Sequence, residues 1–324
     1  MIVTLTANPS LDRTVEIPGE LGRGTVIRAV RSAADPGGKG VNIARALSVS
    51  GVESVAVLPG DDGDPVLTAL TEANVRYSNL ATGTPIRTNV TVAEPDGTTT
   101  KINAPGEPFH AESQQELTRL LIGEAKTASW LVLAGSLPPG VPSDYYAVIS
   151  RAVRESLGGQ APRMAVDTSG AALRDTLVGR DGLPNLIKPN SEELAELVGR
   201  PGQWQEMEQS PQLTADTALE LVERGVEAVL ATLGAHGAVL VTAQGAWHAV
   251  HAPIRARSTV GAGDCSLAGY LLAHQAGRSP QECLAQAVAH GSAAASLPGT
   301  QVPTLDQTTP EAVTITQLPA DSTR

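Results

Sequence analysis

The sequence is poor in cysteine and in aromatic residues. Its 324 residues include two cysteines, Cys265 and Cys283, which are too few for a disulfide framework and lack the paired spacing of a zinc site. We therefore expect a protein of a reducing compartment, the cytoplasm. Aromatic residues make up 2 % of the chain, so aliphatic and alanine side chains must fill the core. The content of 41 % hydrophobic and 18 % charged residues is otherwise that of an ordinary globular protein.

Positive charge and long apolar runs are also scarce. The chain carries 23 Lys and Arg against 34 Asp and Glu, a formal net charge of −11. Nucleic acids and anionic membranes are bound through an excess of Lys and Arg, so we expect neither as a partner, and any phosphate must be held by a local site. No apolar run approaches the ~18 residues of a membrane span, and residues 1–10 lack the basic region of a signal peptide.

What the chain has is an alternation of short apolar runs with helical patterns. Runs that are apolar at consecutive positions are typical of strands buried on both faces, and apolar residues three and four positions apart are typical of helices. The alternation predicts an α/β protein with a mainly parallel sheet and crossover helices. The expected strands lie at 1–6, 54–60, 130–136, 164–169, 186–190, 228–234 and 238–243, and the expected helices include 39–51, 65–75, 143–156, 191–199 and 217–225.

Two segments, at about 13–33 and 86–104, interrupt this alternation. In the second, the sequence Pro-Asp-Gly at 95–97 is a turn signal between two runs of alternating polar and apolar residues. We predict strands that stand off the main sheet as a small lid, which could close over a ligand and exclude water. No repeat or linker divides the chain, so residues 1–324 are expected to form one domain.

The most informative loop spans residues 258–277. Gly261 and Gly263 lack the Cβ atoms that would keep a phosphate away from the backbone, and a helical pattern follows them. The N–H groups here lie at a helix N-terminus, where free donors and the helix dipole favour an anion. The loop predicts a cradle for a transferring phosphoryl group, with Ala262 between the glycines and Asp264 within reach of the attacking hydroxyl. The alternative is that Asp264 only caps the helix.

Other nucleotide-binding and phosphate-binding motifs are missing. The lysine of the GGKG segment at 37–40 has no glycine at the P-loop spacing before it, and the protein-kinase motifs are absent. The first expected strand is not followed by GxGxxG, which argues against a dinucleotide-binding oxidoreductase.

Six motifs occur in a fixed order along the chain: NPSLDRT at 8–14, PGGKGVNIARAL at 36–47, DGTTTKIN at 96–103, GSLPPGV at 135–141, KPNSEEL at 188–194 and TVGAGD at 259–264. With them the chain resembles the ribokinase-like phosphofructokinase-B family of sugar kinases over nearly its whole length. Within that family it is most similar to the 1-phosphofructokinase branch. The resemblance implies a ribokinase-like three-layer α/β/α core with a small β-sheet lid.

The resemblance also implies an activity. It is the ATP-dependent, Mg²⁺-dependent phosphorylation of fructose 1-phosphate at its 6-hydroxyl, giving fructose 1,6-bisphosphate and ADP. The nearest alternatives are a tagatose-6-phosphate kinase and a 6-phosphofructokinase of the same family. A non-catalytic sugar-phosphate sensor is a third, but it predicts a broken anion cradle, and GAGD at 261–264 is intact. Members of the family often pair through the lid, so a homodimer is a further expectation.

Roles for individual residues follow from the same resemblance. Asp264 would be the base, and Gly261, Ala262 and Gly263 the anion hole. Bare backbone donors and a carboxylate acceptor together suit a sugar's hydroxyl groups. Among the cations, Arg87 is the strongest candidate for the sugar's resident phosphate, because a guanidinium can donate two parallel hydrogen bonds, and Arg28 is a weaker one. The substrate contacts would come from Asp12, Gly37, Gly38, Lys39, Asn42, Arg87, Lys101, Asn103 and Ser136.

The nucleotide side is implied in the same way. Asn190 and Glu193 would act on Mg²⁺ through bound water, since Mg²⁺ keeps several waters in most proteins. The same two residues also suit a helix N-terminus, with Asn190 as its cap. The turn at 234–237 would line the ribose and phosphates, and Gly291 would leave room for adenine. The nucleotide contacts would come from Lys188, Asn190, Glu193, Thr232, Gly234, Gly237 and Gly291.

Overall fold

The computed structural model describes residues 1–179 and 182–319. Its main sheet has ten strands in the order β14-β13-β12-β11-β10-β9-β8-β1-β4-β5. From β11 to β5 each neighbouring pair is parallel, and β12, β13 and β14 add an antiparallel edge. The strands are β1 (Ile2–Thr6), β4 (Ser54–Pro59), β5 (Tyr77–Leu80), β8 (Trp130–Ala134), β9 (Arg163–Asp167), β10 (Leu186–Ile187), β11 (Ala228–Thr232), β12 (Ala238–Thr242), β13 (Gly245–His251) and β14 (Val313–Leu318).

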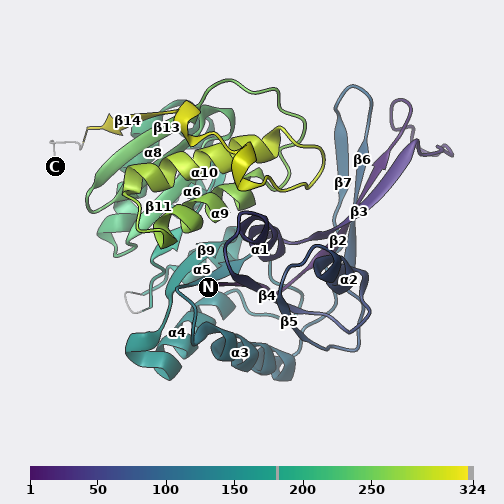
Figure 1. Cartoon of the computed structure of the whole chain (residues 1–324), viewed down its shortest axis with the longest axis horizontal. Helices are drawn as coiled ribbons and strands as arrows, with labels where there is room; N and C mark the ends of the chain where they lie inside the picture. Colours follow the sequence, from purple (N-terminus) through teal and green to yellow (C-terminus); the bar gives the residue numbers. More distant parts are fainter. Residues whose placement is uncertain (180–181, 320–324) are drawn as a thin grey trace.

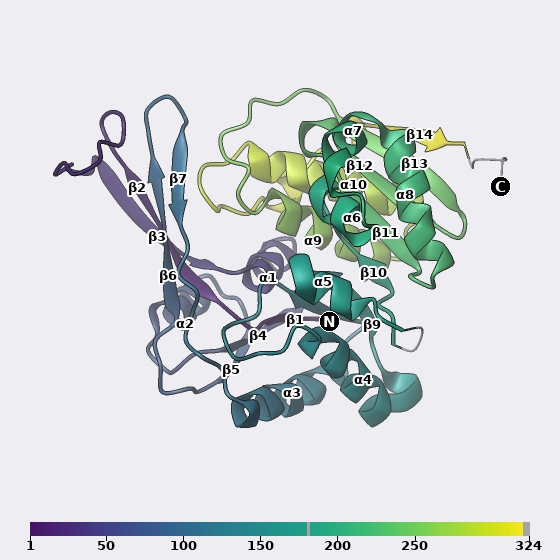
Figure 2. The ribbon, with the colours of Figure 1, turned by 180° about the vertical axis from the view of Figure 1, so that it is seen from behind.

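Helices cover both faces of this sheet. Figure 1 shows α1, α9 and α10 on the near face, and Figure 2 shows α3 to α8 on the other. Among the described residues no helix has the length and apolarity to traverse a bilayer. The helices are α1 (Lys39–Val49), α2 (Pro65–Glu72), α3 (Ala111–Ala125), α4 (Tyr145–Leu157), α5 (Gly170–Thr176), α6 (Ser191–Leu197), α7 (Trp204–Gln209), α8 (Pro211–Glu223), α9 (Ala262–Gln275) and α10 (Pro280–Ala295).

The core consists of two apolar layers, one on each side of the sheet. Every residue of β1, β4 and β8 is buried, which explains why their sequences are apolar at consecutive positions. One layer packs these strands against α3, α4, α6 and α8. On the other side, β1 and β8 pack against α1, α9 and α10, and β4 packs against α1 and α2. Each fully buried Leu or Ile contributes roughly 1.5–3 kcal/mol, so these layers supply most of the free energy that holds the helices on the sheet. The three-layer α/β/α core that the sequence predicts is confirmed.

A second sheet of four strands stands beside the core as the lid. Its order is β3-β2-β6-β7, with β2 and β6 parallel and the other two pairs antiparallel. Figure 1 shows it projecting away from the main sheet, separate from α9 and α10. The small β-sheet lid of the expected fold class is therefore confirmed. Its strands are β2 (Ser10–Glu16), β3 (Arg31–Gly37), β6 (Arg87–Ala93) and β7 (Thr99–Ile102).

The register of the lid gives it one polar and one apolar face. Asp12 of β2 is opposite Asp35 of β3 and Asn89 of β6, so these three share one face. Val15 is opposite Val92 on the other face, which also carries Leu11 and Val90. Gly37, the last residue of β3 before α1, lies two positions after Asp35 and is therefore on the polar face.

The start of α1 lies directly against the end of β1. Thr4 Oγ1 donates a hydrogen bond to the carbonyl of Gly40 over 2.9 Å. A Cβ on Gly40 would lie 2.6 Å from the carbonyl oxygen of Leu5, and one on Gly38 would lie 2.6 Å from Thr6 Cγ2. Gly38 also has a φ of 109°, which disfavours any residue with a Cβ. Two glycines thus let the first turn of α1 reach the carboxyl edge of the sheet, where ligands bind in open α/β folds.

Candidate active site

Asp264 lies in the first turn of α9. Gly261 caps this helix with a left-handed φ of 77°, and the N–H groups of the turn are free of side-chain caps. The carboxylate is 7 % exposed. Asn42 of α1 donates from Nδ2 to Asp264 Oδ2 over 2.8 Å, although 222 residues separate the two in sequence. The structure therefore brings together the predicted base, the predicted anion hole and one predicted sugar-binding residue.

The environment of Asp264 makes it an unusually basic aspartate. Burial raises its pKa to about 6, and the nearby negative charge of Asp167 adds to the rise. The hydrogen bond from Asn42 and the positive charges of Lys39 and Lys188 oppose it. At pH 7 the carboxylate is mostly ionised, yet it accepts a proton more readily than an exposed aspartate does. That combination suits a general base.

Two lysines share one buried carboxylate next to this turn. Lys39 Nζ donates to Asp167 Oδ1 over 2.7 Å, and Lys188 Nζ forms an ion pair with Oδ2 at 3.1 Å. Burial alone would raise the pKa of Asp167, but the two lysines hold it below its ordinary value. Asp167 and Glu193 raise the pKa of Lys39 in spite of burial. A Cβ on Gly263 would lie 3.2 Å from Lys188 Nζ, so this ammonium faces the N-terminus of α9.

A second polar group lies at the base of the lid. Asp12 accepts hydrogen bonds at Oδ1 from Ser10 Oγ (2.7 Å) and from Asn89 Nδ2 (2.9 Å). A Cβ on Gly37 would overlap the Asp12 carboxylate, so only glycine leaves this acid room. Asp12 and Gly37 are thus adjacent, as expected of two contacts to one sugar. Gly38, the N-cap of α1, lies between them and Lys39.

Arg87 is committed to the protein backbone. Its Nε donates to the carbonyl of Pro9 (3.3 Å) and its two terminal nitrogens donate to those of Ala104 (2.6 Å) and Asn8 (3.2 Å). Burial lowers the pKa of its guanidinium. Three of the five N–H groups of an arginine are therefore used in holding the lid to the core. Its role as the main phosphate ligand stays a prediction. Ser136 lies nearby, 3.5 Å from Asn8 Nδ2.

The structure does not bring the remaining substrate candidates to Asp264. Lys101 and Asn103 are exposed at the end of the lid hairpin, and Arg28 is exposed on the loop before β3. Lys101 is opposite Thr91, two positions along β6 from Asn89, so it shares the polar lid face with Asp12. Lys39, one of the expected substrate contacts, points to Asp167 on the α9 side, and its contact with substrate stays a prediction.

On the expected nucleotide side, Asn190 and Glu193 form a capping box at the start of α6. Asn190 Oδ1 accepts from the Glu193 N–H (2.7 Å), and Glu193 Oε2 accepts from the Asn190 N–H (2.9 Å). The helix-cap interpretation is therefore correct. Glu193 Oε1 remains 3.9 Å from Lys39 Nζ. Thr232, at the end of β11, pairs with Asn190 through an isolated bridge, so these predicted residues are neighbours.

Three glycines on this side are explained by local packing. A Cβ on Gly237, where φ is 85°, would overlap the carbonyl oxygen of Ala249. Gly234 has a φ of 54° at the preceding turn. A Cβ on Gly291 would lie 3.3 Å from the carbonyl oxygen of Ala262, so this glycine lets α10 approach the first turn of α9. Contact of these positions with a nucleotide stays a prediction.

The acidic residues near the expected nucleotide site suit a metal ion that is bound mainly through the nucleotide's phosphates and water. Among residues 1–179 and 182–319 no group of three or more His, Cys, Asp or Glu side chains could hold an ion. Mg²⁺ usually takes one or two carboxylates, several waters and substrate phosphates. Glu193 fits such an indirect role. Its Oε2 accepts the hydrogen bond of the helix cap, whereas its Oε1 lies 3.9 Å from Lys39 Nζ.

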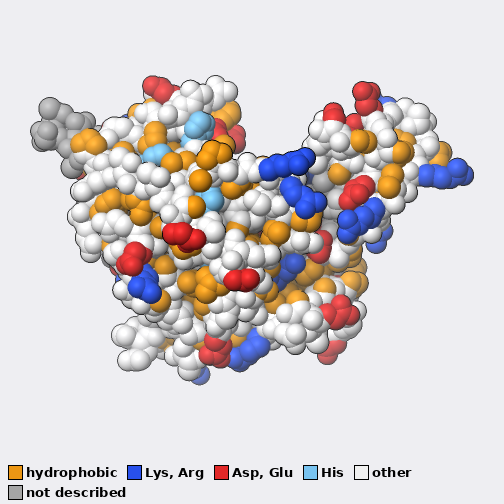
Figure 3. Space-filling view, turned by 45° about the horizontal axis from the view of Figure 1, so that its top comes forward, with side chains coloured by type: hydrophobic (Ala, Val, Ile, Leu, Met, Phe, Trp, Pro, Cys, Tyr) orange, Lys and Arg blue, Asp and Glu red, His pale blue; other side chains and the backbone are white. Residues whose placement is uncertain are grey.

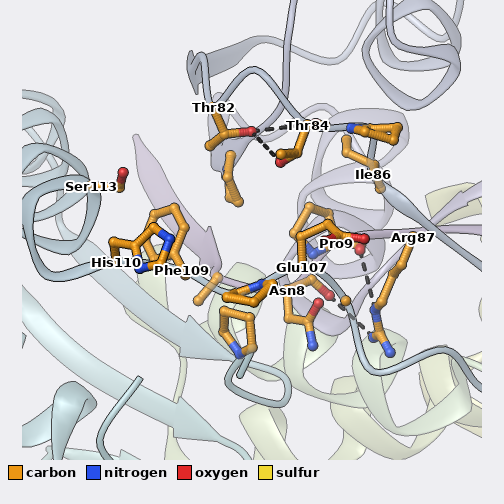
Figure 4. Close-up of a pocket in the computed structure, with 16 residues that line it drawn as sticks. Asn8, Pro9, Thr82, Thr84, Ile86, Arg87, Glu107, Phe109, His110 and Ser113 are labelled. Atoms are coloured by element: carbon orange, nitrogen blue, oxygen red, sulfur yellow. Dashed lines mark hydrogen bonds between the residues drawn. The ribbon is translucent and has the colours of Figure 1, made fainter. Parts of the chain in front are cut away.

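An open cleft separates the lid from the main body (Figure 3). Figure 3 shows a deep notch between the lid and the main body, bordered by Lys and Arg side chains. A separate cavity of about 370 Å³ lies beside the lid base, and Figure 4 shows Arg87 at its edge bonded to Asn8 and Pro9. Neither Asp264 nor Asp12 lines that cavity. We therefore assign the candidate active site to the cleft.

Sequence reasoning missed two residues of this site. Asp167 is fully buried and joins two of the predicted lysines, and Asn89 holds the Asp12 carboxylate. A signal for Asp167 was available, because an acid at the end of a buried strand must find charged partners. Asn89 gave none beyond its place in an alternating strand.

Comparison with known proteins points to one family. The family model described as pfkB family carbohydrate kinase matches residues 7–307. The chain is 32 % identical over 311 residues to the ATP-dependent 6-phosphofructokinase isozyme 2 of Escherichia coli (strain K12), covering 95 % of this chain and 96 % of that protein. It is 34 % identical over 328 residues to the 1-phosphofructokinase of Rhodobacter capsulatus, covering 97 % and 96 %. Relatives with either activity thus stand at similar distances.

Solved structures agree with the fold. The phosphofructokinase-2 from Escherichia coli, in complex with substrates and products, superposes with a TM-score of 0.85 at 30 % identity, covering 94 % of this chain and 96 % of that one. A ribokinase from Thermotoga maritima reaches 0.73 at 16 % identity, covering 95 % and 97 %. The fold class is therefore ribokinase-like.

Proposed function

The chain belongs to the pfkB family of carbohydrate kinases, and from this premise we propose that it phosphorylates fructose 1-phosphate at the 6-hydroxyl, using ATP. The observation that carries the proposal is the contact between Asp264 and Asn42 at the free N-terminus of α9. It joins a carboxylate with a raised pKa to a bare-backbone anion cradle. The choice of fructose 1-phosphate rests on the resemblance of the six motifs, taken together, to the 1-phosphofructokinase branch.

In the proposed reaction the chain supplies position and charge. Asp264 accepts the proton of the sugar's 6-hydroxyl as the hydroxyl oxygen attacks the γ-phosphorus of ATP. The bond between the γ-phosphorus and the β–γ bridging oxygen breaks, and ADP leaves. The backbone N–H groups at 261–263, with Lys188 beside them, stabilise the negative charge of the transferred group. Asp12 accepts hydrogen bonds from sugar hydroxyls and Gly37 leaves backbone donors open to them. The polar face of the lid covers the sugar and excludes water.

ATP and Mg²⁺ are assigned to the edge of the sheet beyond Lys188. The cap of α6 and the end of β11 are neighbours there, through Asn190 and Thr232. When bound, Mg²⁺ neutralises charge on the nucleotide phosphates, and Glu193 is the carboxylate best placed to reach its water shell. We assign all of this to one kinase domain spanning residues 1–324.

A 6-phosphofructokinase is the strongest alternative, because a relative with that activity is about as similar as one with 1-phosphofructokinase activity. A tagatose-6-phosphate kinase is a further one. Fructose 1,6-bisphosphate is nearly two-fold symmetric about its ring, so one phosphate site can accept either monophosphate. Selectivity then depends on few contacts rather than on the transfer machinery.

The test is a comparison of kcat/KM on fructose 1-phosphate, fructose 6-phosphate and tagatose 6-phosphate at saturating Mg·ATP. We expect a preference of about tenfold or more for fructose 1-phosphate, the scale of one or two polar contacts. A reversed preference for either 6-phosphate would assign the chain to the corresponding alternative. Binding of sugar phosphate without turnover of any of the three would support the sensor.

We also propose that two copies pair through the lid. The apolar lid face ends in Ile102, which is 62 % exposed, and Val30, which precedes β3 at the opposite edge of the lid sheet, is 69 % exposed. Covering them would remove apolar surface from water. Light scattering at micromolar concentration should give a dimer, and Ile102→Glu should give a monomer. Val178→Glu, at a valine 71 % exposed away from the lid, is the matched control. A monomeric parent chain would contradict the pairing.

A further inference from the structure

Within residues 1–179 and 182–319, Asp167 is the one carboxylate that forms ion pairs with both Lys39 and Lys188, near the N-terminus of α9. It ends β9 and is fully buried. One oxygen is held by Lys39 from α1 and the other by Lys188 from the strand end beside it. Lys188 is 5 % exposed, so its charge depends on this partner, whereas the Lys39 side chain is 33 % exposed and would be free to turn to solvent without it.

These contacts also fix where the two ammonium groups lie. Lys188 Nζ is within 3.2 Å of the position that a Cβ on Gly263 would occupy, at the turn that carries the anion cradle. Lys39 leads α1, and Asn42 one turn later holds Asp264. A carboxylate that bridges α1 and the end of β10 therefore holds two positive charges around the cradle.

We propose that Asp167 is a positioning residue: its buried carboxylate keeps Lys39 and Lys188 at the mouth of the α9 N-terminus, where they meet the transferred phosphoryl group. The inference rests on the proposed kinase function and deepens it. Asp167 touches neither sugar nor nucleotide in this assignment. It acts through the lysines, and through its own charge on Asp264.

The charge of Asp167 gives the inference a signature in the pH profile. The charged and polar groups facing Asp264 are Asp167 from β9, Lys39 and Asn42 from α1, and Lys188 after β10. Asp167 raises the pKa of Asp264, and the two lysines lower it. Asp167→Asn removes the negative charge and leaves at least the positive charge of the more exposed Lys39, so the pKa of Asp264 falls. The acidic limb of kcat/KM against pH then moves to lower pH.

The experiment measures kcat, KM for sugar phosphate and the pH profile of Asp167→Asn on the preferred substrate. We expect kcat to fall by about 10²-fold, the scale for loss of one preorganised charge-stabilising contact, with KM changed by less than about threefold. Because the second ionisation of a phosphomonoester also falls near pH 6, the readout is the shift between parent and variant on one substrate.

Two further comparisons protect the test. Glu227→Gln is the matched control, because it breaks the ion pair with Arg163 at the other end of β9, and it should leave kcat and the pH limb unchanged. If Asp167→Asn fails to fold, the change is made in a Lys39→Met, Lys188→Met background. There it should alter kcat by less than about threefold, because the groups it positions are gone.

Each other outcome overturns the inference. These are an unchanged kcat, a lower kcat with an unmoved pH limb, or an equal loss in the background without lysines. Another is a raised Mg²⁺ requirement with kcat restored at high Mg²⁺, which would make Asp167 a metal ligand. If the parent chain is active and Asp167→Asn is unaffected, the role of Asp167 is refuted and the proposed function stands. A parent chain that phosphorylates no ketohexose phosphate refutes the proposed function, and this inference with it.

Discussion

Replacing Asp264 with asparagine is expected to lower kcat by at least about 10²-fold while sugar phosphate still binds. Asparagine is nearly the same size and can still bond to Asn42, but it cannot take the proton of the attacking hydroxyl. The anion cradle of α9 is backbone and remains in place, so a residual rate is also expected. Steady-state kinetics and calorimetric titration with sugar phosphate would measure the two effects.

The same substitution should stabilise the protein at pH 7.5. The pKa of Asp264 is raised to about 6 in the folded state, against about 4 in an unfolded chain. Ionisation of this carboxyl therefore costs folding free energy, roughly 3 kcal/mol, which is fully present above pH 6 and disappears as the pH falls towards 4. Asp264→Asn removes that cost. Thermal unfolding at pH 7.5 should give a higher Tm for the variant.

The combination separates a base from a helix cap. If Asp264 only capped α9, replacing it would lower the stability of the protein and leave turnover nearly intact. Asp216→Asn, in which an acid of α8 loses its charge beside Gln212, is the matched control and should retain the parental kcat. Parental turnover in Asp264→Asn would remove this residue from the proposed mechanism.

Replacing Gly40 with alanine is expected to destabilise the protein by about 2 kcal/mol and to lower kcat/KM by roughly 10²-fold. Alanine inside a helix normally gains about 1 kcal/mol over glycine. Here the new Cβ would lie 2.6 Å from the carbonyl oxygen of Leu5 and 2.5 Å from Thr6 Oγ1, so α1 must move off β1, and overpacking of this kind outweighs the gain. Displacing α1 also displaces Asn42 from Asp264.

Gly123→Ala is the matched control for this prediction. Gly123 lies inside α3 with no atom within 4 Å of an added Cβ. Alanine there should stabilise by about 0.5–1 kcal/mol and leave turnover unchanged. Denaturant unfolding and steady-state kinetics of both variants would decide. If Gly40→Ala were as stable and active as Gly123→Ala, the close approach of α1 to β1 would not be needed for the site.

The layers of the fold could be predicted from the sequence because burial leaves a direct trace in it. Strands that are covered on both faces have apolar residues at consecutive positions. The lid is recognisable as a break in that pattern around a Pro-Asp-Gly turn. The bare loop before α9 could also be predicted, since glycine spacing at a helix start is a local property, and its role as an anion site stays a prediction. These features need no knowledge of distant contacts.

Features that depend on distant partners could not be predicted. The bond between Asn42 and Asp264 spans 222 positions, and only the folded chain shows it. Arg87 has the chemistry of a phosphate ligand, yet three carbonyls occupy most of its donors. Gly291 was expected to leave room for adenine, which stays a prediction, and only the folded chain shows that its missing side chain also admits the first turn of α9. The residue type indicates which groups a side chain can bind, but only the folded structure shows which of them lie within reach.

The bonds of Arg87 bear on how the lid can move. They connect three segments at one point: the chain before β2, the first residue of β6 and the segment after β7. Since β2 and β6 are also joined along their length, the four strands lack an internal joint at their base. We expect the lid to tilt as one rigid plate that pivots near this guanidinium. A bend in mid-sheet would have to break a ladder of backbone hydrogen bonds.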